Sequence, residues 1–139
     1  MSDEIKVADK YIIRKDLLYT SQHEWVKNAG EVYIYGISDF AQKELGELAY
    51  IEFPDVGSTF SKGDTMGSIE ALKTVADYYA PFDCEVVEVN STLEDETELI
   101  NESPYDKGWI LKIKPTNGVE GLLTPEDYAK LIEKEIQQS

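Results

Sequence analysis

Short stretches of alternating hydrophobic and polar residues, separated by turn-forming residues, fill most of the chain between positions 18 and 115. The stretch after the Lys27–Gly30 turn, VYIYGIS, alternates in this way and pairs with the preceding HEWVKN in a predicted β-hairpin. Further strand-like pieces are LAYIEFP, MGSIEAL, VADYYAP, EVVEVN and the half-buried GWILKIKP. Strands so short and so closely spaced predict a mainly β fold, a barrel or a sandwich.

Two segments carry helix signals instead. Ser38 and Gly46 flank DFAQKEL as N-cap and C-cap, which predicts a short internal helix. Thr124 and Pro125 begin a segment with helical apolar spacing, which predicts a C-terminal helix packed on the sheet. Residues 1–18 show no clear period, so we expect them to form an N-terminal extension, an arm or a short added strand, before a domain spanning 19–139.

Length and charge narrow the class of protein. The 139 residues correspond to about one domain, and the net charge of −15 repels phosphate backbones and anionic membrane surfaces, so nucleic acid and membranes are poor partners. No apolar stretch is long enough to span a membrane, and the first residues resemble neither a signal peptide nor a transit peptide. We therefore expect a cytoplasmic protein of a bacterium or archaeon.

The chain has one cysteine, Cys84, and one histidine, His23. An internal disulfide and a Cys/His zinc site are thereby excluded, and the two residues lie far apart in sequence with no catalytic context around either. We expect no metal, no catalytic residue and no enzymatic activity of the chain itself. A buried, inert thiol is the favoured interpretation of Cys84, with a redox-active thiol as the alternative.

Lys73 stands out by its isolation. Between Gly63 and Asp106 the sequence has twelve acidic residues and no other basic one. The strand-like pieces SIEA and VADYYA flank this lysine, which places it near the tip of a hairpin where its side chain points into solvent. The ordinary explanation is a surface lysine that aids solubility. That role does not explain why Lys73 is the only basic residue among so many acidic ones.

The segments around Lys73 resemble a known family. YTSQHEWV, GISDFAQKELGELAYIEFPDVG, SIEALKTVADYYAP, EVVEVN and LINESPYDKGWILKIKP are similar to consecutive blocks of the H protein of the glycine cleavage system, in the family's order. The resemblance runs from Tyr19 to about Pro115. It implies a barrel-sandwich hybrid of the lipoyl/biotinyl-like type, in which two small antiparallel sheets face each other and a short internal helix and a C-terminal helix complete the domain.

By this resemblance, Lys73 carries one lipoic acid in amide linkage and the chain is a carrier for an aminomethyl group and electrons. The implied partners are a pyridoxal-phosphate glycine decarboxylase, an aminomethyltransferase, dihydrolipoamide dehydrogenase and the lipoate-attaching enzyme; we expect a monomer. The resemblance also assigns Glu24, in the HEW motif, to a position near the loaded arm. Glu70 matches the acidic residue that the lipoate-attaching enzyme recognises.

Two departures from the family pattern leave alternatives open. The family's Glu-Ser-Val-Lys-Ala is here EALKT, which is closer to the motif of biotin carriers, so a biotin carrier is one alternative. A lipoyl carrier of another pathway, such as heterodisulfide-reductase-like sulfur oxidation, is the other. Asp83 and Cys84 replace the usual Ser-Gly, and because a glycine there normally supplies a positive φ, we expect a rebuilt turn that tolerates Cys84→Gly.

Overall fold

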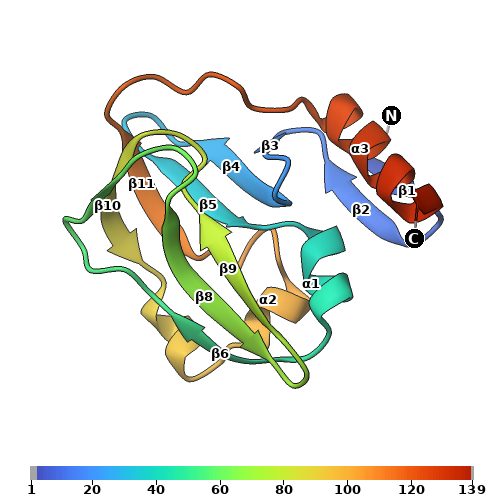
Figure 1. Cartoon of the computed structure of the whole chain (residues 1–139), viewed down its shortest axis with the longest axis horizontal. Coiled ribbons are helices and arrows are strands. Elements are labelled where there is room, and N and C mark those ends of the chain that lie inside the picture. The colour runs from blue at the N-terminus through green and yellow to red at the C-terminus, as the bar shows by residue number, and fades with distance from the viewer. Residues whose placement is uncertain (1–2, 139) are drawn as a thin grey trace.

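Two antiparallel sheets pack face to face in the structure, a computed structural model that describes residues 3–138 (Figure 1). The six-stranded sheet has the order β3-β4-β5-β11-β10-β7, and its strands are β3 (Leu18–Tyr19), β4 (Glu24–Asn28), β5 (Tyr33–Ile37), β11 (Leu111–Pro115), β10 (Cys84–Val89) and β7 (Thr59–Phe60). The three-stranded sheet has the order β6-β8-β9, with β6 (Leu48–Glu52), β8 (Thr65–Ala71) and β9 (Val75–Tyr79). The predicted hairpins and the mainly β fold are confirmed.

The main core lies between these two sheets. Val26 and Tyr35 from the six-stranded sheet share one buried cluster with Ile51, Ile69 and Tyr78 from the three-stranded sheet. Each is one of the inward-facing residues of its strand, as the alternating pattern requires. The hydroxyl of Tyr35 donates a 2.8 Å hydrogen bond to the Tyr79 carbonyl, which joins the sheets directly.

The predicted internal helix is α1 (Asp39–Leu45). Ser38 accepts a hydrogen bond from the N–H of Ala41, and Gly46 ends the helix with a φ of 81°, a conformation that glycine adopts without strain. Two short elements between β10 and β11 were not predicted, a 3₁₀ helix η1 (Ser91–Glu94) and α2 (Leu99–Glu102). Each of these elements is four residues long and places one large apolar residue in the core, Leu93 and Ile100 respectively. A single apolar residue in an acidic, turn-rich segment shows no helical periodicity, so the sequence did not predict them.

The first residues form a hairpin of two strands, β1 (Glu4–Val7) and β2 (Tyr11–Arg14), rather than an arm or one added strand. The predicted C-terminal helix is present as α3 (Pro125–Gln138), and Thr124 accepts a hydrogen bond from the N–H of Asp127. As expected, α3 packs on the six-stranded sheet, where Tyr128 stacks on Tyr19 of the edge strand β3, and it also lies along the N-terminal hairpin, which was not expected (Figure 1).

The hairpin, α1 and α3 enclose a second buried cluster, in which the Tyr19 and Tyr128 rings stack with centroids 4.4 Å apart. Its buried members are Val7, Tyr11, Ile13, Leu17, Tyr19, Trp25, Phe40, Tyr128, Ala129 and Ile132. The strand β4 contributes to both clusters, because Trp25 faces this one and Val26 faces the main core. The second cluster therefore supports the outer side of the six-stranded sheet.

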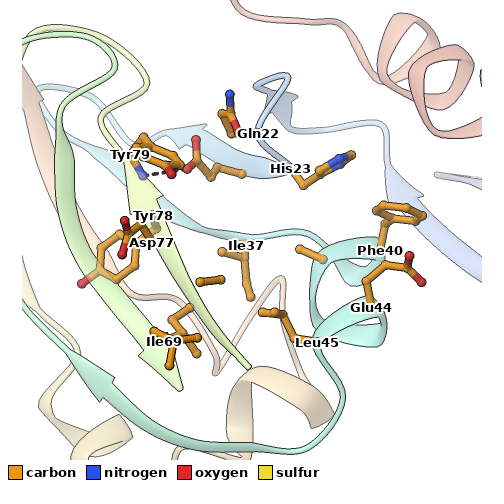
Figure 2. Close-up of a pocket in the computed structure, with 14 residues that line it drawn as sticks. Gln22, His23, Ile37, Phe40, Glu44, Leu45, Ile69, Asp77, Tyr78 and Tyr79 are labelled. Carbon is orange, nitrogen blue, oxygen red and sulfur yellow. Dashed lines mark hydrogen bonds between the residues drawn. The ribbon is translucent and has the colours of Figure 1, made fainter. Parts of the chain in front are cut away.

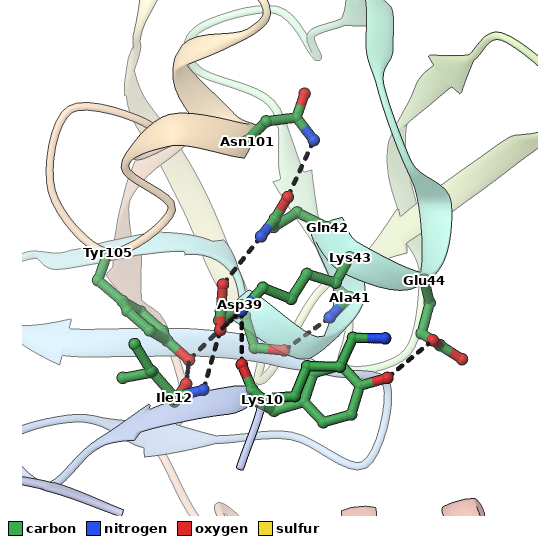
Figure 3. Close-up of polar contacts among 11 residues, drawn as sticks. Lys10, Ile12, Asp39, Ala41, Gln42, Lys43, Glu44, Asn101 and Tyr105 are labelled. Carbon is green, nitrogen blue, oxygen red and sulfur yellow. Dashed lines mark hydrogen bonds and ion pairs between the residues drawn. The ribbon is translucent and has the colours of Figure 1, made fainter. Parts of the chain in front are cut away.

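The buried carboxylate of Asp39 ties the hairpin to α1 (Figure 3). It accepts hydrogen bonds from the backbone N–H of Ile12 at 2.9 Å, from the Gln42 amide at 2.8 Å and from the Lys43 ammonium at 2.9 Å. The hydroxyl of Tyr105 donates to the Ile12 carbonyl and accepts from the N–H of Asp39. These bonds fix the first turn of α1 against the N-terminal strands.

The turn at Asp83 and Cys84 has a positive φ at neither residue, so it is built without the conformation that would favour a glycine. Cys84 is the first residue of β10, fully buried and paired with Phe60 and Pro115. The carboxylate of Asp83 accepts a 2.8 Å hydrogen bond from the N–H of Lys62, and its carbonyl accepts one from Thr116. Asp83 thus anchors two neighbouring loops, one through its side chain and one through its backbone.

Candidate functional site

Lys73 lies exposed at the tip of the β8–β9 hairpin, as the sequence predicts. The N–H of Ala71 donates to the carbonyl of Thr74 at 2.8 Å and closes the turn. The N–H of Leu72 donates to the Glu47 carbonyl at 3.2 Å, which ties the turn to the segment before β6. The lysine side chain is therefore free while its backbone is held at two points.

Two exposed apolar residues flank Lys73. The side chains of Leu72 and Val75 are 68% and 60% exposed. Glu70 is also exposed and lies between Val75 and Tyr50 in one cross-strand row of the three-stranded sheet. The outer face near the lysine thus combines apolar groups with one carboxylate, a composition suited to contact with another protein.

A pocket of about 460 Å³ begins beside this turn and extends along β9 (Figure 2). Every residue of β9 lines it, and the opposite wall comes from α1 and from the loop before β4. The lining also includes the apolar side chains of Ile37 from β5 and Ile69 from β8, and Leu45 contributes an apolar side chain to the α1 wall. The volume falls within the range of pockets that hold a small molecule or a flexible chain.

Glu24 lies at the far end of this pocket from Lys73 and is only 2% exposed. Its carboxylate accepts hydrogen bonds from the N–H of Tyr79 and from the Thr20 hydroxyl, both at 2.8 Å. Burial raises the pKa of Glu24 to about 7, although both of these bonds act in the opposite direction. A small change in its surroundings therefore decides whether this carboxyl is charged near neutral pH.

The pocket is acidic as a whole. Asp77 from β9 and Glu44 from α1 line it together with Glu24, and the only basic side chain in its lining is the imidazole of His23. A positively charged group of small size is therefore favoured there over an anion. Sequence reasoning assigned no role to Glu44 or Asp77, because nothing in the local sequence distinguishes either from an ordinary surface carboxylate.

His23 and Cys84 are not brought together. His23 lies beside the second buried cluster, where its ring nitrogens contact the Tyr128 hydroxyl at 2.9 Å and the Glu135 carboxylate at 3.0 Å. Cys84 belongs to the main core, and burial raises the pKa of its thiol to about 12. The described residues 3–138 contain no group of three or more His, Cys, Asp and Glu that could hold a metal ion, and none of their helices is long and apolar enough to cross a membrane.

Comparison with known proteins agrees with this arrangement. The family model for the Glycine cleavage H-protein matches residues 17–135. The chain belongs to this family. The match includes α3 and leaves out β1 and β2, so it extends beyond Pro115, where the sequence resemblance was placed. The main functional prediction, a carrier rather than an enzyme, is that of the family and is confirmed.

Individual relatives give the same result. A glycine cleavage system H protein of Listeria monocytogenes serotype 4a is 54% identical over 121 residues, which is 86% of this chain and 97% of the relative. The one from Carboxydothermus hydrogenoformans is 48% identical over 126 residues, with 89% and 97% covered. A crystal structure of the Mycobacterium marinum protein superposes with a TM-score of 0.79 at 37% identity, covering 85% of this chain and 97% of that one. The predicted barrel-sandwich fold is confirmed.

Proposed function

We propose that Lys73 carries one lipoic acid in amide linkage and that the chain transfers an aminomethyl group and electrons between the enzymes of glycine cleavage. One observation supports this most strongly. The exposed lysine is held on a fixed turn, and the acidic pocket along β9 begins two residues after it. When bound, the lipoyl group supplies a strained disulfide that opens to hold a group on one sulfur and recloses on oxidation.

The role of the hairpin tip is to present the arm. Amide formation removes the charge of Lys73, so no buried ion has to be accommodated when the arm lies against the protein. Leu72 and Val75 leave apolar surface on both sides of the lysine. We propose that this surface and Glu70 are what the lipoate-attaching enzyme contacts, since they are exposed beside Lys73.

The role of the pocket is to protect the carried group. The carboxylates of Glu24, Glu44 and Asp77 favour an aminomethyl group in its cationic form. The apolar wall between them excludes water, and water is the reagent that would hydrolyse the carbon–sulfur linkage. We propose that Glu24, at the end of the pocket away from Lys73, faces the carried amine.

The partners follow from the same proposal. A pyridoxal-phosphate decarboxylase loads the carrier, an aminomethyltransferase removes the one-carbon unit, and dihydrolipoamide dehydrogenase reoxidises it. Each requires the arm to leave the pocket, and the exposed position of Lys73 permits this.

Intact-mass measurement tests the attachment site. After incubation with a lipoate ligase and lipoic acid, the wild-type chain should gain one lipoyl group, Lys73→Ala should gain none, and Lys107→Ala, which removes an exposed lysine elsewhere, should gain one. Modification of Lys73→Ala would disprove the assignment. Modification by a biotin ligase, or failure of the lipoylated protein to exchange glycine carboxyl carbon with a cognate decarboxylase, would favour the alternative carriers.

A further inference from the structure

The hydroxyl of Tyr128, on the C-terminal helix, connects the two segments that together form the pocket wall opposite β9, namely α1 and the loop before β4. It contacts the Ser38 hydroxyl at 2.6 Å and the Nδ1 atom of His23 at 2.9 Å. Tyr128 is itself fully buried, and its ring is fixed by the stack on Tyr19. Because a buried hydroxyl with two partners is costly to leave unpaired, this position of Tyr128 is strongly preferred.

Ser38 leads to the α1 wall. Its hydroxyl caps α1 by accepting from the N–H of Ala41, and Ala41 and its neighbour Phe40 line the pocket. His23 belongs to the loop before β4, which forms the other part of this wall, and it directly precedes Glu24 in the chain. The N–H of Ser38 also donates to the His23 carbonyl at 2.9 Å, so the two segments are joined by backbone as well as through Tyr128.

The backbone of His23 shows that this connection fixes its conformation. His23 has a φ of 69°, in the left-handed region that non-glycine residues seldom occupy. Such a conformation persists only where the surroundings hold it. Here the centroid of the His23 ring lies 4.8 Å from that of Phe40, and Nε2 reaches Glu135 at 3.0 Å. His23 and Phe40 lie on one side of the pocket and Tyr79 on the other (Figure 2). The Glu24 carboxylate accepts its hydrogen bond from the N–H of Tyr79, on that other side.

We propose that Tyr128 is a positioning residue whose hydroxyl holds the two parts of the pocket together, so that the C-terminal helix determines how firmly the pocket retains the carried group. This proposal rests on the proposed function, namely that the carried aminomethyl group is held beside Glu24. Tyr128 does not line the pocket itself, and it acts through Ser38 and His23.

The unmodified protein gives the first test. Tyr128→Phe keeps the ring and removes both hydroxyl contacts, and the amide protons of Ser38 and Ala41 should then exchange about fivefold faster, the equivalent of one hydrogen bond. Tyr19→Phe is the matched control, because its hydroxyl bonds Arg14 within the same aromatic stack and away from the pocket. Equal exchange at Ser38 and Ala41 in both variants would overturn the proposal.

The loaded carrier gives the second test. The aminomethyl arm, formed with the decarboxylase, is lost by hydrolysis as the carbon–sulfur bond breaks and one water yields a thiol, formaldehyde and ammonium. Loss should be about fivefold faster in Tyr128→Phe and unchanged in Tyr19→Phe. The ring-proton NMR signals of His23, the only histidine, should shift on loading in the wild type and not in Tyr128→Phe.

Further variants separate the possible failures. If Glu24→Gln retains the group as long as the wild type, the pocket does not hold it and the proposed function fails at that step. If Glu24→Gln loses it quickly but Tyr128→Phe does not, only the positioning role is disproved. Should Tyr128→Phe not fold, Glu135→Ala removes the other partner of His23 from a partly exposed position and should give about a twofold effect, with the exposed Glu133→Ala as control.

Discussion

The carboxylate of Glu24 accepts a hydrogen bond from the backbone N–H of Tyr79 across 2.8 Å, and the two residues are 55 positions apart in the chain. Glu24 begins β4 of the six-stranded sheet, and Tyr79 ends β9 of the three-stranded sheet. The bond therefore joins the two sheets at the end of the pocket. Because β9 begins two residues after Lys73, a single strand connects the turn that carries Lys73 to the buried carboxyl.

Glu24 should make the protein less stable as the pH rises. Its pKa of about 7 in the folded protein exceeds the usual value of 4.5, so between these values the folded state keeps a proton that the unfolded chain has lost. Stability then falls with increasing pH over this window, by roughly 3 kcal/mol in total. Urea denaturation from pH 4.5 to 7.5 should show this loss in the wild type and not in Glu24→Gln. Parallel pH profiles of the two proteins would contradict the assigned pKa.

Glu70 should affect attachment of the arm and not the fold. It is exposed and lies in a cross-strand row near Lys73, so Glu70→Gln should change the free energy of unfolding by less than about 0.5 kcal/mol. The initial rate of lipoylation should fall about tenfold, the effect of losing one charge-assisted contact with the attaching enzyme. Glu31→Gln, in the β4–β5 turn at the other end of the molecule, is the control (Figure 1). Equal rates for the two variants would remove Glu70 from the recognition surface.

Asp39 should be important for stability and not for attachment. Asp39→Ala removes the acceptor for the N–H of Ile12 and for the Gln42 amide, and should lower the free energy of unfolding by about 2–3 kcal/mol. The Lys43 ammonium keeps its bond to the Lys10 carbonyl. Lipoylation of the folded variant should proceed at the wild-type rate, because the β8–β9 hairpin lies in a different sheet. The exposed Asp95→Ala is the control, measured by urea denaturation. If the free energy of unfolding fell by less than about 1 kcal/mol, the N-terminal hairpin β1–β2 would be held on α1 by apolar packing alone.

Local signals in the sequence correctly predicted α1, the exposed position of Lys73 and seven strands, which are β4, β5, β6, β8, β9, β10 and β11. Ser38 and Gly46 mark α1 by capping chemistry alone, and the alternation in VADYY marks β9. Contacts between distant segments left no such signal. Nothing near Tyr128 indicates that its hydroxyl meets His23, 105 residues away, since its helical spacing predicts only a core position. The pocket was likewise not predictable, because the residues that line it come from four separate segments of the chain.

The N-terminal hairpin was missed for a related reason. Its strands are four residues each, and the turn between them has Ala8 and Asp9 at positive φ, where glycine or asparagine would have signalled a turn. The burial of Ile13 and Val7 depends on α3, which arrives from the far end of the chain. The division of the chain into an extension of residues 1–18 and a domain of residues 19–139 stays a prediction.

Cys84 should be inert in the folded protein and costly to replace by glycine. It is fully buried and its thiol has a pKa of about 12, so an aromatic disulfide reagent at pH 8 should label it only as fast as the chain unfolds, whereas labelling in urea should be complete within seconds. Because Cys84 lies in a strand with no positive φ, glycine brings no conformational advantage there. It adds a cavity and backbone entropy, and Cys84→Gly should lower stability by about 2 kcal/mol, more than Cys84→Ala. Rapid labelling of the native protein, or equal stability of Cys84→Gly and the wild type, would contradict this placement in the core.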